Sequence, residues 1–388
     1  MKILFVTSRN AYSTCGELRL IKNRTITLLR DYKVETDFLL FRDKKNLKRS
    51  QETIPCSSFE IITHSFIDYS VKYSKLKKCV SNKIENEGYA GIIISGVNLL
   101  PLVRDIKKFY PQIKVLADLH GAFEELIEFK TSSLFKNIVR GIYYRVAKYN
   151  EKKYLLQFDG FLAVSHALQD YIQKEYNIQD KPFFIVPCAV FDTIQSVEVL
   201  RDKRKYARSK YNVRNDETLF IYSGGISPWQ CIEESVGMFK AICERNNQIK
   251  GRMLILSGNL QAIKHFECEN IRVDSLPADK VQDILCGGDY AFMLRGNFVT
   301  NNVAFPNKFL EYVAAGLNII TTNHVHDVRD YINQYNLGIC LPDDVHIEDN
   351  GYFINKTDYP SNYINRKRLI EQTTFVTTLK PVIDFLCH

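Results

Sequence analysis

Short apolar runs alternate with longer amphipathic stretches along the whole chain, and this alternation constrains the fold more than any other feature. Lys2–Ser8 and Gly91–Gly96 in the first half, and Thr218–Ser223 and Asp289–Leu294 in the second, are brief and mostly apolar. Such runs are typical of strands in a parallel sheet, with the amphipathic stretches as crossover helices. The pattern occurs twice in 388 residues, enough for two ordinary domains. The sequence therefore predicts an α/β protein with two Rossmann-like, doubly wound domains facing a central cleft.

The alternation also predicts the domain boundaries. An N-terminal domain is expected over residues 1–190 and a C-terminal domain over residues 216–363. Between them, 191–215 is predicted to be a linker region with a charged helix. The last segment, 364–388, is predicted to be one helix that packs back towards the N-terminal domain.

Charge is distributed unevenly between the two halves. Residues 1–190 hold 30 Lys and Arg against 20 Asp and Glu, a net charge of +10, whereas residues 191–388 hold 22 against 24. A basic half suits an anionic membrane surface, a nucleic acid or an acidic substrate, and it is equally compatible with a solvated surface that has no partner. No nucleic-acid-binding module is visible in the sequence, so a nucleic-acid partner is not expected.

Several familiar signals are absent from the sequence. No apolar run is long enough to span a bilayer, and the N-terminal run is too short for a signal peptide. The ten cysteines form no C-x-x-C pair, which favours reduced core thiols and a cytoplasmic protein. Dinucleotide, P-loop, zinc-protease and nucleophile-elbow motifs are missing, and no His/Cys cluster has metal-ligand spacing. We therefore expect no metal and no cofactor.

Polar residues follow two predicted strands at the positions where open α/β sheets bind ligands. In the second half, Gly224-Gly225 ends a strand and precedes a helix, a geometry that can cradle a phosphate but is weak as a lone motif. In the first half, a lone histidine would more often be structural, but one followed by glycine and two carboxylates at a strand end favours a function. These first-half residues are Asp118, His120, Glu124 and Glu125.

The stretch that follows Arg295 combines a helix start with one cation and one carboxylate. Pro306 is favoured in the first turn of a helix, and Gly316 suits a left-handed exit from it. Lys308 and Glu311 lie three residues apart and therefore share one face. Because a helix N-terminus attracts phosphate, the lysine can meet a phosphate while the glutamate accepts hydrogen bonds from sugar hydroxyls. A capped surface helix with an internal ion pair explains the same residues equally well.

Residues 131–157 form a long predicted helix that is rich in aromatic and basic side chains. A basic amphipathic helix can lie on a membrane interface, but more often such a helix packs its apolar face on a core. The sequence leaves both interpretations open. A second basic helix, predicted over 69–86 with four lysines between Lys72 and Lys78, belongs to the same membrane hypothesis.

A series of motifs follows in a fixed order: Asp118-Leu119-His120-Gly121 with two glutamates after it, Asp159–Ser165, Val186-Pro187-Cys188, Tyr222–Gly225, Arg295, and Pro306-x-Lys308-x-x-Glu311-Tyr312 with Gly316. In this order and over nearly the whole chain, they resemble glycosyltransferases of the GT-B fold, and among them the GT4-like group. The resemblance implies a nucleotide-sugar donor, with a UDP-sugar favoured over a GDP-sugar, held mainly by the C-terminal domain. It also implies an acceptor held mainly by the N-terminal domain, and retaining, metal-independent transfer.

The resemblance assigns roles to the residues at matching positions. Glu311 would bind the ribose hydroxyls, and His120 would lie near the donor sugar and the reaction centre. Arg295 and Lys308 would neutralise the diphosphate, a task that suits fixed cations because the departing diphosphate gains negative charge. The other donor-binding candidates are Gly16, Gly224, Gly225, Gln230, Asn302 and Asn307, and the acceptor-side candidates are Asp118, Glu124 and Glu125.

Three positions depart from the family pattern, and one of them is the first loop, which has a single glycine, Gly16, in place of a glycine pair. The group usually has two glutamates separated by seven residues, and the first of them falls at Val303, whose side chain cannot accept a hydrogen bond. We therefore expect the donor sugar to be recognised differently, through Asn301, Asn302 or nearby backbone. Many relatives also carry Arg and Lys where this chain has Ser227–Gln230, so the phosphate charge would fall on the two cations named above.

The leading hypothesis is a glycosyltransferase of the hexosyltransferase type. It would move a sugar from a nucleotide-diphosphate sugar to a saccharide or lipid-linked acceptor in cell-surface polysaccharide or glycoconjugate biosynthesis. It would work in the cytoplasm, and peripheral contact with an anionic inner membrane face is a further hypothesis. Two alternatives stay open: a nucleotide-sugar epimerase of the same architecture, and a non-catalytic nucleotide-sugar-binding subunit.

Overall fold

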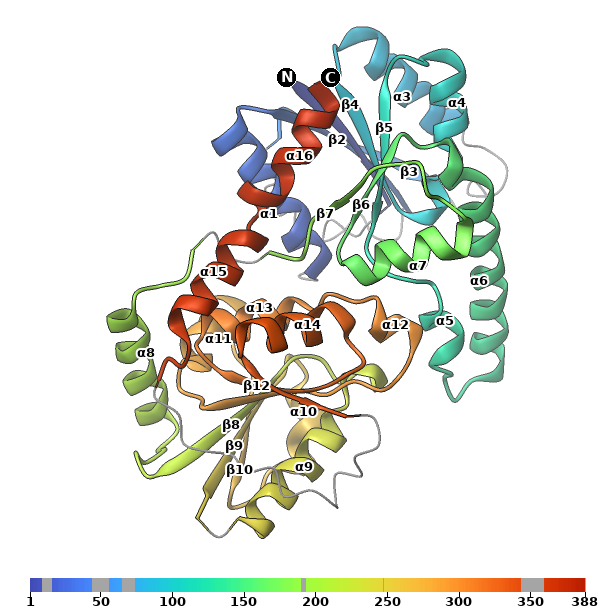
Figure 1. Ribbon diagram of the computed structural model, residues 1–388. Helices are drawn as coiled ribbons and strands as arrows, with labels where there is room; N and C mark the ends of the chain where they lie inside the picture. The colour runs from blue at the N-terminus through green and yellow to red at the C-terminus, as the bar shows by residue number, and fades with distance from the viewer. Residues whose placement is uncertain are drawn as a thin grey trace. The chain divides into compact units, whose positions relative to one another are not determined.

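The computed structural model describes residues 1–8, 16–43, 56–64, 74–189, 193–246, 248–342 and 359–387 (Figure 1). These residues form two compact units. Unit 1 comprises Met1–Ala189 with Thr373–His388, and unit 2 comprises Val190–Gln372. The predicted loop before Gly16, part of the predicted basic helix including Lys72, and most of the polar segment 343–363 lie outside the described residues.

Unit 1 is built on a parallel sheet whose described strands follow the order β3-β2-β1-β4-β5-β6-β7. Strands are added on one side of β1 as far as β3, and then on its other side from β4 to β7, so the sheet is doubly wound. The topological switch point lies between β1 and β4, where Phe5 pairs with Ile93. The strands are β1 (Lys2–Thr7), β2 (Glu35–Asp43), β3 (Ser58–His64), β4 (Gly91–Ser95), β5 (Lys114–Leu119), β6 (Gly160–Ala163) and β7 (Phe183–Ile185). The helices are α1 (Gly16–Tyr32), α3 (Ser74–Asn86), α4 (Leu102–Phe109), α5 (Glu125–Glu128), α6 (Leu134–Tyr154), α7 (His166–Tyr176) and α16 (Phe375–Cys387).

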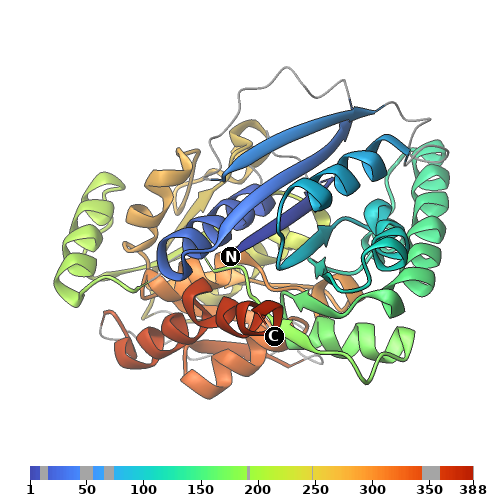
Figure 2. The ribbon, with the colours of Figure 1, turned by 90° about the horizontal axis from the view of Figure 1, so that it is seen from above.

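The C-terminal helix α16 belongs to the core of unit 1. It packs along α1 and against β7 (Figures 1 and 2). Phe375 and Leu379 of α16 share one buried apolar cluster with Ile3 and Phe38 of the sheet. The two ends of the chain therefore lie side by side, with Cys387 in contact with the first residue.

The sequence predicted a single helix over 364–388, but the structure has two helices there. The first, α15 (Tyr363–Thr373), lies in unit 2 except for its last residue, and α16 lies in unit 1. Thr374 separates them because its side chain accepts a hydrogen bond from the backbone N–H of Thr377 at 3.1 Å. A threonine in this position starts a new helix.

Unit 2 repeats the doubly wound pattern. Its described strands follow the order β10-β9-β8-β11-β12-β13, with the switch point between β8 and β11, where Phe220 pairs with Tyr290. The strands are β8 (Glu217–Ser223), β9 (Lys250–Leu256), β10 (Ile271–Asp274), β11 (Tyr290–Met293), β12 (Asn318–Thr322) and β13 (Gly338–Leu341). The helices, besides α15, are α8 (Val197–Lys210), α9 (Ile232–Arg245), α10 (Leu260–Ile263), α11 (Ala278–Leu285), α12 (Val299–Asn302), α13 (Asn307–Ala314) and α14 (His326–Tyr335).

Helix α8 is part of unit 2, although the sequence predicted a linker region over 191–215. Arg204 and Arg208 extend from α8 and both form ion pairs with Asp289, which immediately precedes β11. Arg208 is 6% exposed. These buried charge pairs attach the helix to the sheet.

The cysteine pattern predicted a cytoplasmic protein with reduced core thiols, and no apolar run in the sequence is long enough to span a bilayer. In the described residues the cysteines are free thiols, and Cys286 is buried as expected, whereas Cys268 and Cys387 are exposed. The prediction of core thiols therefore holds for some positions only. Among the described helices, none is both long and apolar enough to cross a membrane.

Candidate functional site

The carboxyl ends of β8 and β11 hold most of the predicted donor-binding residues. Gly224 directly follows β8 and Arg295 follows β11, so both stand at the topological switch point of unit 2. This edge of a doubly wound sheet is where ligands bind. Gln230 comes from the 3₁₀ turn Pro228–Gln230, and Lys308 from the first turn of α13. The structure brings these four residues together.

Two buried cations converge on one neutral oxygen atom. Lys308 Nζ donates to Gln230 Oε1 at 2.6 Å, and Arg295 Nη2 lies 3.4 Å from the same oxygen. Arg295 Nη1 also donates to the backbone oxygens of Gln230 (3.2 Å) and Leu294 (2.7 Å). Arg295 is 4% exposed and Lys308 is 8% exposed. Within the described part of the chain, the hydrogen bonds of both cations therefore go to neutral oxygens.

Burial disfavours the charge on both side chains. It lowers the pKa of Lys308 well below the ordinary value, and the nearby guanidinium of Arg295 lowers it further, while Glu311 acts in the opposite direction. Burial also lowers the pKa of Arg295, although a guanidinium stays charged at neutral pH. A bound anion would compensate both effects, because an opposite charge favours the charged form of its neighbour. The site is therefore arranged to receive an anion.

Gly224 lies directly against the end of the Lys308 side chain. A Cβ atom on Gly224 would lie 2.5 Å from Lys308 Nζ, and the backbone has φ +150, where side chains are strained. At Gly225 the nearest atom to such a Cβ would be Gln230 Nε2 at 3.8 Å, an ordinary contact. Of the predicted glycine pair, the first member is thus favoured by its backbone conformation, whereas a side chain at the second would meet only an ordinary contact.

Two tyrosines to which the sequence analysis assigned no role hold the lysine in position. The Tyr312 hydroxyl is fully buried, accepts a hydrogen bond from the Ser223 N–H (2.9 Å) and donates to the Ser223 oxygen (3.2 Å). This fixes α13 against the end of β8, and Lys308 lies one helical turn before Tyr312. The ring of Tyr222 lies 4.7 Å from Lys308 Nζ, within the range of cation–π contact. The four-residue spacing of Lys308 and Tyr312 is the signal that could have found this support.

Three other predicted donor-binding residues lie on α12 and α13. Glu311 is half-buried and lies three residues after Lys308 on α13, so the two share one face of the helix. Asn307 is the first residue of α13. Asn302 ends α12, where its side chain is hydrogen-bonded to that of Asn297 at 3.2 Å.

Val303 lies where the GT4-like pattern usually has a glutamate, and its side chain is packed in the interior. Val303 is 4% exposed, directly after α12. Asn301 is 2% exposed, and its amide donates to the Gly296 oxygen at 2.9 Å. Asn302 is half-buried, so it is the more accessible of the two asparagines expected to replace the missing glutamate.

In unit 1 the structure brings Asp118 and His120 together with Arg24. Asp118 Oδ1 accepts a hydrogen bond from Arg24 Nη1 at 2.9 Å, and Asp118 Oδ2 lies 2.8 Å from His120 Nε2. Burial alone would raise the pKa of Asp118, but Arg24 and His120 hold it well below its ordinary value. The ionised carboxylate orients the imidazole ring. Arg24 lies mid-way along α1 and has no sequence signal that would have identified it.

Glu124 lies in a separate network of unit 1. Its Oε1 accepts a hydrogen bond from the Tyr171 hydroxyl (2.5 Å) and lies 3.3 Å from Lys148 Nζ. Glu125 begins α5, where its backbone oxygen accepts a hydrogen bond from Arg140 at 2.7 Å. The two glutamates therefore join α5 to α6 and α7.

The same network contains a buried carboxyl group whose protonation links stability to pH. Glu151 is 4% exposed and accepts a hydrogen bond from the Tyr176 hydroxyl (2.6 Å), and burial raises its pKa from 4.5 to about 7. Between these values the folded protein holds a proton that the unfolded chain releases, so the free energy of unfolding falls as the pH rises. Glu151→Gln is expected to leave stability at pH 5 nearly unchanged and to raise it at pH 8 by about 1–3 kcal/mol.

Urea unfolding at both pH values measures this effect. Glu175→Gln is the matched control, because Glu175 pairs with Lys148 in the same network but is 45% exposed. It is expected to preserve the pH dependence of the parent. An unchanged pH dependence in Glu151→Gln would show that Glu151 is not the titrating group.

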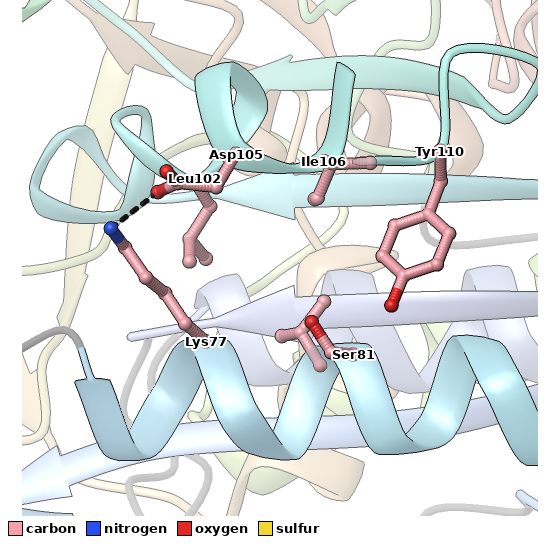
Figure 3. A pocket seen from close by; sticks show the side chains of 7 residues that line it. Lys77, Ser81, Leu102, Asp105, Ile106 and Tyr110 are labelled. Atoms are coloured by element: carbon pink, nitrogen blue, oxygen red, sulfur yellow. Dashed lines mark ion pairs between the residues drawn. The ribbon is translucent and has the colours of Figure 1, made fainter. Parts of the chain in front are cut away.

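Other candidate sites in the described residues have weaker support. A hollow of about 10 Å³ between α3 and α4 is spanned by the ion pair of Lys77 and Asp105 at 2.7 Å (Figure 3). Small-molecule sites usually measure roughly 300–1,000 Å³. None of the predicted site residues lines this hollow. The described residues contain no group of three or more His, Cys, Asp or Glu side chains that could hold a metal ion.

Comparison with known proteins gives matches in structure rather than in sequence. No protein-family model and no curated protein matches the chain. The lipopolysaccharide glycosyltransferase WaaG superposes with a TM-score of 0.66 at 12% identity, covering 99% of each chain. Alr3699/HepE from Anabaena, solved with UDP-glucose, gives 0.63 at 14% identity over 100% of this chain and 99% of that one. The lipopolysaccharide outer core galactosyltransferase WaaB gives 0.63 at 14% over 99% of each.

The fold is the GT-B glycosyltransferase fold. The fold class predicted from the sequence, with two Rossmann-like doubly wound units, is therefore confirmed. At these identities the likeness concerns the fold. The chemistry depends on the residues of this chain.

Proposed function

We propose that the protein is a glycosyltransferase that takes its sugar from a nucleoside diphosphate donor, with a UDP-sugar favoured. One observation carries the proposal: Arg295 and Lys308, both buried, meet on a neutral oxygen at the switch point of unit 2. Two cations at this position suit a diphosphate. The UDP-glucose named for the structurally similar HepE supports a uridine nucleotide.

The residues of unit 2 account for donor binding and for departure of the nucleotide. Arg295 and Lys308 would bind the diphosphate, with Gly224 allowing close approach, and Glu311 would accept hydrogen bonds from the ribose. Negative charge grows on the phosphate oxygen as its bond to the sugar breaks, and fixed cations stabilise that charge without reorganisation. This supports metal-independent transfer, and the GT4-like motifs support retention of configuration.

The residues of unit 1 are assigned to the acceptor and the reaction centre. His120, oriented by Asp118, would contact the donor sugar, while Glu124 and Glu125 stay acceptor-side candidates. The acceptor would be a saccharide or a lipid-linked saccharide in cell-surface polysaccharide or glycoconjugate biosynthesis, and the enzyme would work in the cytoplasm or peripherally on the inner membrane face. The lipopolysaccharide pathway named for WaaG and WaaB supports this class of acceptor.

Thermal unfolding with a panel of UDP, GDP, ADP and their sugars tests the donor. A ligand that binds only the folded state stabilises it by about 2.7 kcal/mol at a hundred times its Kd, so UDP is expected to raise the Tm by several degrees. Glu311→Gln is expected to lose part of this shift because a neutral amide accepts weaker hydrogen bonds from the ribose. The exposed Glu371→Gln on α15 is the control and is expected to keep the full shift.

Each outcome of this test has a defined meaning. The donor proposal fails if no nucleotide in the panel raises the Tm of the parent. If UDP-sugars bind, analysis of the products separates transfer to an acceptor from isomerised donor, the product of an epimerase. Binding without any turnover would identify a non-catalytic subunit.

A further inference from the structure

Helix α6 (Leu134–Tyr154) carries its apolar residues on the side that faces away from unit 1. Seven of them are 44–76% exposed. The helix lies at the periphery of unit 1 in both ribbon views (Figures 1 and 2). We call this set the α6 outer face: Leu134, Phe135, Ile138, Val139, Ile142, Val146 and Tyr149.

The opposite side of α6 is polar and is held inside unit 1 by hydrogen bonds. Arg140 donates to the backbone oxygen of Glu125 at 2.7 Å, and the buried Glu151 accepts from Tyr176 on α7 at 2.6 Å. Lys148, between them, forms a hydrogen bond with Tyr171 of α7 at 2.8 Å. Turning the helix to bury its apolar side would break these bonds and leave buried charges unpaired, which is costly.

This arrangement reverses the usual orientation of a surface helix, whose apolar stripe faces the core. The sequence left open whether the apolar side of this helix packs on a core. In the structure it does not. Contiguous exposed apolar side chains of this extent mark an interaction surface.

The charges around the α6 outer face identify its partner. Lys136, Arg145, Lys152 and Lys153 are exposed, and the one acidic residue of α6, Glu151, is buried. At 100° per residue, Arg145 and Lys152 lie along one border of the outer face and Lys136 along the other. An apolar stripe bordered by cations, with no exposed acid on the helix, is typical of helices that lie in the interface of an anionic bilayer.

We propose that the α6 outer face binds the surface of a bilayer that contains anionic lipids, with Phe135, Ile138 and Ile142 entering the interface and the bordering cations contacting the headgroups. The helix lies on the membrane and does not cross it, in keeping with its charged residues. That this contact brings the enzyme to a lipid-linked acceptor rests on the function proposed above. The binding itself does not.

Flotation of the full chain with lipid vesicles tests the proposal. The parent is expected to float with vesicles containing about 30% anionic lipid, to bind purely zwitterionic vesicles at least about fivefold less, and to be released in about 1 M salt. Ile142→Glu is expected to lower binding to anionic vesicles about tenfold because it places a charge among the apolar contacts. The double variant Lys152→Glu/Lys153→Glu is expected to lower binding by at least the same factor and to remove most of its salt dependence.

Ile364→Glu is the matched control, since Ile364 is 65% exposed on α15 of unit 2 and Ile142 is 56% exposed. It is expected to float like the parent. Both isoleucine variants should keep the Tm of the parent and its stabilisation by UDP, which separates loss of membrane binding from loss of the donor site.

Three results would overturn the proposal. The parent could fail to float with anionic vesicles, or Ile142→Glu could bind as well as the parent. Sedimentation without lipid could also show a dimer of the parent that Ile142→Glu dissociates, which would identify a second copy of the chain as the occupant of this face.

Discussion

Replacing Lys308 with methionine is expected to reduce sugar transfer at least about a hundredfold while the ligand-free protein stays as stable as the parent or becomes more stable. The activity is lost because one of the two cations that stabilise the departing diphosphate is removed. Stability is retained because the buried amine costs free energy in the empty site, where its pKa is held well below the ordinary value. Methionine fills a similar volume without that cost.

Steady-state kinetics measures the loss of sugar transfer, and thermal unfolding measures the retained stability. Lys280→Met, at a lysine that is 64% exposed on α11, is the control and is expected to change neither quantity. If Lys308→Met kept its kcat and its affinity for UDP, the lysine would be an ordinary core residue and the proposed donor site would be wrong.

The pH dependence of UDP binding gives a second readout of the same variant. A diphosphate binds the charged amine, whereas the empty site favours the neutral amine. UDP affinity of the parent is therefore expected to fall as the pH rises through the lowered pKa of Lys308. In Lys308→Met this part of the pH dependence should disappear, as titration calorimetry over a range of pH would show.

Most of the sheet topology follows from local pattern. The predicted strands Lys2–Ser8 and Thr218–Ser223 each differ by one residue from β1 and β8, because each is a short apolar run next to polar residues. Strand β3 (Ser58–His64) was not predicted. It lies at the edge of its sheet, where pairing on one side alone leaves a weaker pattern. The four-residue helix α12 was also missed, since such a short helix depends on tertiary contacts.

The sequence proposed the residues of the candidate donor site, but not their geometry. Motif order indicated Arg295 and Lys308, yet nothing local in the sequence shows that they meet on Gln230, which lies 65 and 78 positions away. That meeting depends on the order of β8 and β11 in the sheet. Arg24 was missed for the same reason, because its partner Asp118 is 94 positions away.

Helix α6 shows a different limit of sequence pattern. Its periodicity predicted an amphipathic helix correctly, and a surface helix normally turns its apolar side inwards. The orientation is decided instead by buried polar partners on other helices, such as the hydrogen bond between Glu151 and Tyr176. The pattern of one sequence shows that the helix has an apolar stripe. It does not show the buried polar partners that decide which way the stripe faces.

Replacing Gln230 with glutamate is expected to stabilise the ligand-free protein and to weaken UDP binding by about a hundredfold or more. The new carboxylate would stand where the amide oxygen now lies, 2.6 Å from Lys308 Nζ and 3.4 Å from Arg295 Nη2. It would supply from within the chain the negative charge that a diphosphate supplies from outside. Two charge-assisted hydrogen bonds of about 1.5–3 kcal/mol each, from Lys308 and Arg295 to the new carboxylate, would compete with binding of the diphosphate.

Opposite changes in stability and affinity distinguish this prediction from simple damage to the site. The Tm of Gln230→Glu should rise by roughly 5 °C, whereas the shift produced by UDP should shrink or vanish. Gln248→Glu adds the same charge in an exposed turn of unit 2 and should alter neither value. A lower Tm together with weaker binding would mean that the two cations do not form an anion site. A higher Tm with undiminished UDP binding would place the diphosphate elsewhere in unit 2.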